Sequence, residues 1–224
     1  MSNEQSGNRS TRPFDADVEV SVGTDRLGGH LTVPGDSGGI VIFAHGSGSS
    51  RHSRRNGLVA ESLNRAGLGT LLFDLLTEAE EGDTANVFDI DLLGDRLRDT
   101  TRWLREHAAA RGLRVGYFGA STGAAAALWA AADLGEEVSA IVSRGGRPDL
   151  AGPRIPDVQA PTLLIVGSRD RQVLKLNRSA QADMKCESRL EVVRGATHLF
   201  EEPGALDVVT ELAQDWFVRR VLAN

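Results

Sequence analysis

A serine between glycines is the first feature of this sequence that could do chemistry. Gly119-Ala-Ser-Thr-Gly123 follows a short apolar run and precedes the alanine-rich residues 124–132. A strand, a sharp turn, a serine and a helix in this order are typical of a nucleophile elbow, which exposes the serine hydroxyl above a sheet. Gly119 and Gly123 leave room for the turn because neither has a Cβ. The alternative is an ordinary strand-to-helix turn with an incidental serine.

An acid and a base follow two later strand-like segments. Asp170 closes the sequence Gly167-Ser-Arg-Asp170, and His198 closes Gly195-Ala-Thr-His198. A serine hydroxyl is a weak nucleophile at neutral pH and needs a base within hydrogen-bond reach. We expect His198 to take the proton of Ser121 and Asp170 to orient the imidazole. Taken singly, Asp170 could equally cap a turn or helix, and His198 could be solvated.

Acyl transfer also needs hydrogen-bond donors for the developing oxyanion. The backbone N–H of Thr122, directly after the nucleophile, is the first candidate. His45-Gly-Ser-Gly48 follows an earlier apolar run, and we assign the N–H of Ser47 as the second donor. His45 would then anchor this loop without transferring protons. The alternative is a glycine-serine turn with no role in catalysis.

Arginines follow two of the same strand-like segments. Arg51 comes after the proposed oxyanion loop, and Arg144 and Arg147 come after residues 138–143. Arginine can bind a carboxylate or phosphate through two parallel hydrogen bonds. We therefore expect Arg144, and less strongly Arg51, to contact an anionic group of the substrate. The alternative is that they lie in solvated loops or pair with the acidic residues 78–83.

Alternating strand and helix patterns must position these residues. Buried strands are predicted from apolar runs, and a hairpin from two alternating segments around the turn residues Gly23-Thr-Asp25. The strands are expected at residues 18–22, 27–33, 40–44, 69–73, 115–119, 138–143, 161–166 and 190–193. Helices are expected at residues 54–66, 89–111, 124–132, 173–183 and 205–222, with an acidic loop at 77–83.

This order predicts an α/β fold with a mostly parallel sheet of about eight strands. We expect an N-terminal antiparallel hairpin, helices on both faces and no large cap domain. Residues 1–13 are predicted to form a flexible tail, and residues 14–224 a single domain. In a parallel sheet, ligands bind outside the carboxyl ends of the strands. Ser121, Asp170, His198 and the loop with Ser47 should therefore converge at one edge.

Composition narrows the classes of function. The 224 residues carry a net charge of −6, and no basic stripe interleaved with aromatic residues suggests nucleic-acid binding. No apolar run is long enough for a membrane span or a secretory signal, so we expect a cytoplasmic protein that does not bind membranes. Cys186 is the sole cysteine, which excludes an internal disulfide and any multi-cysteine metal site. We predict no metal and no cofactor.

Several segments together resemble the dienelactone hydrolase-like branch of the α/β-hydrolases. The matching pieces are residues 43–48, 72–76, 119–123, 166–170 and 195–204. The resemblance implies an α/β-hydrolase fold that cleaves esters or lactones without a cofactor. It departs from the family's namesake enzymes at position 121, where they have a cysteine nucleophile and this chain has serine. Some similar proteins carry this module beside a phosphoribosyltransferase domain.

The leading hypothesis is a serine hydrolase that cleaves small carboxylic esters or lactones through an acyl-enzyme. A second hypothesis keeps the triad but transfers the acyl group to another acceptor, forms peracids or attacks phosphotriesters. A third is a binding module that reuses the fold without catalysis. The natural substrate and the oligomeric state are left open by the sequence.

Overall fold

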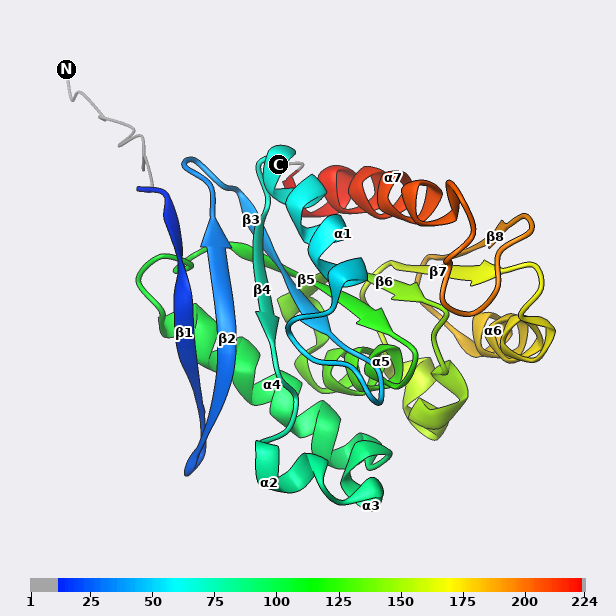
Figure 1. Cartoon of the computed structure of the whole chain (residues 1–224), viewed down its shortest axis with the longest axis horizontal. Helices are drawn as coiled ribbons and strands as arrows, with labels where there is room; N and C mark the ends of the chain where they lie inside the picture. The colour runs from blue at the N-terminus through cyan, green and yellow to red at the C-terminus, as the bar shows by residue number, and fades with distance from the viewer. Residues whose placement is uncertain (1–11, 223–224) are drawn as a thin grey trace.

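The computed structural model describes residues 12–222, so the predicted tail at 1–13 falls almost wholly outside the described residues. Eight strands form one sheet in the order β1-β2-β4-β3-β5-β6-β7-β8, as Figure 1 shows. The strands are β1 (Phe14–Val22), β2 (Asp25–Val33), β3 (Gly39–Ala44), β4 (Gly69–Phe73), β5 (Arg114–Ala120), β6 (Val138–Arg144), β7 (Thr162–Gly167) and β8 (Ser188–Val193).

The sheet is parallel from β4 through β8 and antiparallel at its N-terminal edge. β1 pairs with β2 around the turn at Gly23, where φ is +57° and glycine avoids the strain of a side chain. β2 in turn pairs antiparallel with β4. The remaining neighbours are all parallel. The predicted mostly parallel sheet with an N-terminal hairpin is confirmed, and six strands end at the same edge.

Helices cover both faces of the sheet, as predicted. α1 (Arg54–Arg65) and α7 (Ala205–Phe217) pack together on one face, and the chain continues from α7 into a π-helical turn at Val218–Leu222. The other face carries α4 (Ile90–Glu106), α5 (Thr122–Leu134) and α6 (Arg171–Asp183). The short helices are α2 (Glu78–Glu81), α3 (Thr84–Val87) and the 3-10 segments Gly135–Glu137 and Pro148–Asp157.

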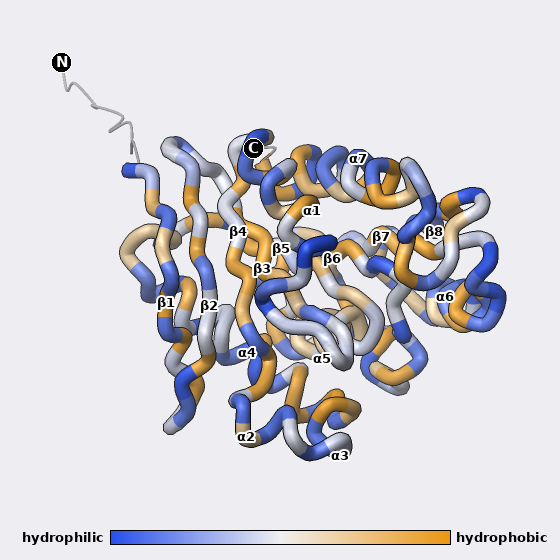
Figure 2. The backbone as a smooth tube through the Cα atoms, in the orientation of Figure 1, coloured by the Kyte–Doolittle hydropathy of each residue, from blue (hydrophilic) through white to orange (hydrophobic). Residues whose placement is uncertain are grey.

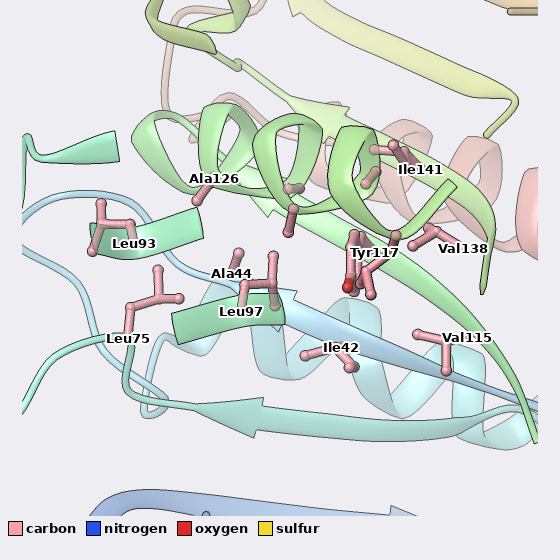
Figure 3. Close-up of a cluster of buried hydrophobic side chains, with 14 of the residues drawn as sticks. Ile42, Ala44, Leu75, Leu93, Leu97, Val115, Tyr117, Ala126, Val138 and Ile141 are labelled. Carbon is pink, nitrogen blue, oxygen red and sulfur yellow. The ribbon is translucent and has the colours of Figure 1, made fainter. Parts of the chain in front are cut away.

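The apolar runs of the central strands form the core between these layers. Figure 2 shows hydrophobic residues concentrated along the middle strands, and Figure 3 shows Leu97 of α4 beside Ile42 of β3 and Leu93 of α4 beside Leu75. Tyr117 is fully buried there, and its hydroxyl lies 2.5 Å from the hydroxyl of Thr101. Burial without water raises the pKa of this phenol, and the hydrogen bond satisfies its one polar atom.

Two local predictions were wrong. The helix expected at 89–111 ends at Glu106, because His107 adopts an extended backbone conformation with ψ of 128°. The acidic loop expected at 77–83 contains α2, and α3 follows directly. Thr77 and Glu80 form a reciprocal capping box at the start of α2, a pattern that the sequence displays but that periodicity does not detect.

Among residues 12–222, no helix combines the length and the apolar composition that a membrane span requires.

A histidine and two carboxylates on the exposed face of the β1–β2 hairpin should make the stability of the protein depend on pH. His30 lies 2.9 Å from carboxylate oxygens of both Asp17 and Asp15. The hydrogen bond to Asp17, opposed by partial burial, raises the pKa of His30 above its ordinary value. The stabilisation is therefore complete below the ordinary histidine pKa of about 6.5 and is lost as pH rises through the raised value.

We expect His30→Gln to lower the free energy of unfolding more at about pH 5.5 than at about pH 8.5, as measured by urea denaturation. At the lower pH both carboxylates remain ionised, because hydrogen bonds from Thr32 and His30 lower the pKa of Asp15 and the hydrogen bond from His30 lowers that of Asp17. An equal or larger loss at the higher pH would contradict this assignment.

Candidate active site

Ser121 has the strained backbone conformation expected of a nucleophile elbow. Its φ is +51° and its ψ is −118°, which non-glycine residues rarely adopt. It is the residue that caps α5, yet its side chain makes no capping hydrogen bond. The hydroxyl is therefore left for another purpose, and the N-terminus of α5 lies directly behind it.

Close backbone approach explains both glycines of the elbow. A Cβ on Gly119 would lie 2.4 Å from the Cα of Ala124. A Cβ on Gly123 would lie 2.2 Å from the carbonyl oxygen of Ala44 and 2.4 Å from that of His45. Backbone atoms cannot move aside as a flexible side chain can, so α5 begins in contact with the end of β3 only because position 123 is glycine.

The predicted acid and base meet after β7 and β8. Asp170 Oδ2 lies 2.6 Å from His198 Nδ1, within the range of a charge-assisted hydrogen bond. Asp170 begins α6 without making a side-chain cap, which leaves its carboxylate available to the imidazole. About 39% of the His198 side chain is exposed, so the ring remains accessible on one side.

The two loops that carry Asp170 and His198 are joined by hydrogen bonds from backbone N–H groups. Arg169 N–H donates to the carbonyl of Ala196 at 2.9 Å, and Gly195 N–H donates to Ser168 Oγ at 2.8 Å. Gly167 permits this contact, because a Cβ there would lie 2.4 Å from the Ala196 carbonyl oxygen. The separation of acid and base is thus set by the backbone of both loops.

Residues 144–147 contact both Ser121 and His198. Ser121 N–H donates to the carbonyl of Arg144, and Arg147 N–H donates to the carbonyl of Ser121. Between them, Gly145 lies under His198: a Cβ there would be 3.5 Å from its Nδ1. No hydrogen bond joins the Ser121 and His198 side chains within residues 12–222; in unliganded enzymes such bonds are often long.

The two candidate oxyanion donors meet at Thr122. Ser47 N–H donates to Thr122 Oγ1 at 2.9 Å, across 75 residues of sequence. The N–H of Thr122 is in the first turn of α5, where backbone donors have no acceptor within the helix. Gly46 lies against the elbow, since a Cβ there would be 3.0 Å from Ser121 Cβ. The loop and the elbow are in direct contact.

His45 anchors the loop, in agreement with its predicted role. Its Nε2 accepts the N–H of Leu75 at 3.1 Å, so Nδ1 carries the proton and donates to the carbonyl of Gly46. The ring is buried, and both nitrogens have partners. This arrangement fixes the neutral tautomer and leaves no nitrogen of His45 for proton transfer.

A pocket of about 400 Å³ opens beside the loop and the elbow. Its polar wall contains residues 45–50 and Thr122, and its apolar wall contains Leu75, Leu76, Val87 and Leu93. The helices α2 and α3 contribute Glu81 and Val87 to this wall. Arg96 holds this segment in place, because its guanidinium pairs with Glu80 and also with Asp25 of the hairpin.

The three arginines that were candidates for substrate binding have different surroundings. Arg51 pairs with Asp74 at the end of β4, through its guanidinium and through its backbone N–H at 2.7 Å. Arg147 forms a two-pronged pair with Asp149, at 2.9 and 2.7 Å. Arg144 is buried, and its guanidinium makes no hydrogen bond or ion pair within the described part of the chain.

Comparison with known proteins identifies the family. A crystal structure of dienelactone hydrolase from Anabaena variabilis is 52% identical, with a TM-score of 0.90, and the match covers 93% of this chain and 99% of that one. The chain belongs to the dienelactone hydrolase family of α/β-hydrolases. No family model matches it.

Two further proteins are similar to this chain, one in sequence and one in fold alone. A Mycobacterium tuberculosis protein whose name refers to a phosphoribosyl transferase is 61% identical over 204 residues, which are 91% of this chain and 46% of that protein. This dienelactone hydrolase-family chain thus spans about half the length of that relative. Est1E from Butyrivibrio proteoclasticus shares the fold at 14% identity, with a TM-score of 0.79 and coverage of 92% of this chain and 99% of its own.

Sequence reasoning missed several residues that shape the site of this dienelactone hydrolase-family protein. The pocket wall from α2 and α3 was expected to be loop, although the capping box of Thr77 and Glu80 was a usable signal. Asp74 follows β4 directly, as Asp170 follows β7 after a short turn, and strand-end position could have drawn attention to it. Within residues 12–222, no cluster of three metal-binding side chains is present.

The elbow geometry predicts opposite effects for two glycine-to-alanine substitutions. Gly123→Ala should lower the free energy of unfolding by about 3 kcal/mol or more, because its Cβ would overlap the Ala44 and His45 carbonyls. Gly57→Ala in α1 is the control, since a Cβ there meets nothing within 4 Å, and it should raise stability by about 0.5–1 kcal/mol. Urea denaturation measures both; similar values for the two variants would contradict the close approach.

Proposed function

We propose that this protein is a serine hydrolase that cleaves small carboxylic esters or lactones through an acyl-enzyme. The main support is the 2.6 Å hydrogen bond between His198 and Asp170, located where the β5–α5 elbow presents Ser121. Membership of the dienelactone hydrolase family supports the same conclusion. Position 121 is a serine, and a serine hydroxyl needs a nearby base to activate it as a nucleophile.

In the proposed first step, Ser121 Oγ attacks the carbonyl carbon of the ester. His198 Nε2 accepts the hydroxyl proton as the new C–O bond forms. Asp170 accepts the Nδ1 hydrogen bond, which holds the productive tautomer and stabilises the imidazolium. The tetrahedral intermediate then expels the alcohol, which receives the proton from His198. Water repeats the sequence to release the acid and restore Ser121.

The oxyanion of the tetrahedral intermediate would lie between the N–H groups of Thr122 and Ser47. The positive end of α5 favours the same negative charge. Removing one such donor typically costs about 2.7–4 kcal/mol of transition-state stabilisation. Thr122 Oγ1 holds the Ser47 N–H beside the elbow at 2.9 Å, which supports a preformed pair of donors.

The apolar pocket supports a small organic group on the substrate. Its volume of about 400 Å³ lies in the range of small-molecule sites, and its inner wall is aliphatic. The proposed partner is therefore a small-molecule ester or lactone. Acid–base and nucleophilic chemistry by three side chains completes this reaction, so the proposal includes no cofactor.

The triad predicts how activity responds to substitution. Ser121→Ala, His198→Ala and Asp170→Asn should each lower kcat for p-nitrophenyl butyrate by roughly 10³- to 10⁶-fold, because the residues act as one unit. Ser21→Ala, on the exposed side of β1, is the matched control and should keep wild-type activity. Circular dichroism checks that each variant is folded.

A fluorophosphonate probe separates the alternatives. Stoichiometric labelling of Ser121, located by mass spectrometry, supports a nucleophile, whereas failure to label folded protein would favour a non-catalytic binding module. Product analysis with added methanol or hydrogen peroxide distinguishes hydrolysis from acyl transfer and peracid formation. Full activity in Ser121→Ala would end the proposal.

Two substitutions of Thr122, one that removes the hydroxyl and one that keeps it, should differ in kcat. Thr122→Val removes the acceptor of the Ser47 N–H and should lower kcat about 10-fold, with little change in KM, because a lost hydrogen bond of about 1–1.5 kcal/mol would loosen an oxyanion donor. Thr122→Ser keeps the hydroxyl and should stay within about 3-fold of wild type. Steady-state kinetics measure both; equal kcat values for the two variants would contradict this role.

A further inference from the structure

The two edges of the sheet differ in the charges that they would present to a partner strand. β1 and β8 are the outermost strands, as Figure 1 shows. On β1, Asp15, Asp17 and Glu19 alternate along the exposed face, and the strand contains no basic residue. Two copies of β1 that paired about the middle of this run would set carboxylate opposite carboxylate, which is destabilising. The acidic row therefore protects this edge against pairing with a second copy.

β8 lacks the features that usually protect an edge strand. No proline or lysine interrupts the segment Ser188–Val193, and its pairing with β7 is regular throughout. Val192 lies in this strand with 41% of its surface exposed, although it is a large apolar residue. An exposed edge of this kind can pair with a further strand.

Three residues of β8 direct their backbone groups away from β7. The carbonyls of Glu187 and Val193 accept N–H groups from the β7 side, so the odd-numbered residues bond to β7 and the even-numbered residues face the free edge. The residues at the free edge are Ser188, Leu190 and Val192. In the part of the chain that the structure describes, the backbone groups of Leu190 and Val192 form no hydrogen bond outside the β7–β8 pairing. Donors and acceptors for a partner strand are thus in place.

The side chains of β8 form a charged row and an apolar row. Arg189 and Glu191 lie on the same face as Val193, which is buried under α7, and they pair with each other. Leu190 and Val192 lie on the opposite face, beside α6. The charged row thus carries one positive and one negative group side by side, unlike the acidic row of β1.

The charges select one register for the antiparallel pairing of two β8 strands. With a two-fold axis at Leu190, Arg189 of each copy lies opposite Glu191 of the other, on the same face of the joined sheet. An axis at Arg189 would set arginine opposite arginine, and an axis at Glu191 would set glutamate opposite glutamate. The favoured register also places the two copies of Leu190 opposite each other and each Val192 diagonal to them, which covers apolar surface.

We propose that the protein forms a two-fold symmetric homodimer through β8, which joins the sheets of two copies into one continuous sheet. About six backbone hydrogen bonds would connect the copies, because each edge residue exchanges both of its bonds with the residue opposite. The Ser188 carbonyl, which accepts the side-chain amide of Gln181 at 3.2 Å, has a second lone pair for this purpose. The proposal does not depend on ester hydrolysis.

Charge reversal at the two strand positions tests the interface. Sedimentation velocity over a range of protein concentrations should show a dimer with twice the 23.9 kDa mass of the chain. Arg189→Glu and Glu191→Arg each set like charges opposite each other and should each weaken the dimer by roughly 10-fold or more. The double variant Arg189→Glu/Glu191→Arg restores opposite charges and should recover it. Arg102→Glu is the control, because this exposed residue is in α4, which packs against β1 at the other edge.

A single cysteine reports the register. After Cys186→Ser removes the only native cysteine, Leu190→Cys should form an intermolecular disulfide on oxidation with copper–phenanthroline. The two Cα atoms at position 190 would lie about 5.5 Å apart, within the range that a disulfide spans. Val192→Cys in the same background is the matched control and should not cross-link, because its Cα would lie about 13 Å or more from its copy along the strand.

Circular dichroism checks that every variant is folded. A monomer at all concentrations, with no cross-link through Leu190→Cys, would overturn the proposal. A dimer that Arg189→Glu leaves unchanged, or that cross-links through Val192→Cys and not through Leu190→Cys, would also overturn it, because the copies would then meet at another surface or in another register.

Discussion

The contact between the first turn of α5 and the end of β3 is the constraint on which the site depends. Gly123 lies so close to the Ala44 and His45 carbonyls that any Cβ would overlap them. This approach brings the loop of residues 45–50 against the elbow and allows Ser47 to reach Thr122. The strained φ of Ser121 belongs to the same turn. A strained residue persists only where its surroundings fix it, and here two packed elements do so.

Charged groups hold the periphery of the site, while backbone contacts hold its centre. Arg51 binds Asp74 and so joins the end of the loop of residues 45–50 to β4. Arg96 connects α2 to the N-terminal hairpin through Glu80 and Asp25. The loops that carry Asp170 and His198, in contrast, are joined by backbone N–H groups that donate to a carbonyl and to a serine hydroxyl. The pocket wall can therefore vary through side chains without disturbing the spacing of Asp170 and His198.

Sequence patterns within single segments predicted much of this fold. Apolar runs located the central strands, because strands buried on both faces contain few polar residues, and alternating segments located the two strands of the hairpin. Strand-end position placed Asp170 and His198 together, since parallel strands end at a common edge. These patterns could not predict side-chain contacts with residues that are distant in the sequence. Arg51 and Arg144 look alike in sequence, yet only tertiary packing decides that Arg51 meets Asp74 and that Arg144 is buried without a carboxylate partner.

The hydrogen bond from Ser47 to Thr122 has a consequence for how binding energy would be used. The backbone N–H of Ser47, which we propose as an oxyanion donor, already has a neutral hydroxyl acceptor. A substrate carbonyl that shared this N–H with the hydroxyl would be a second neutral acceptor, with little net gain in ground-state affinity. The gain would arise only as negative charge accumulates on that oxygen, because charged acceptors form stronger bonds. Sharing the donor in this way would thus favour the transition state over the bound substrate and so raise kcat.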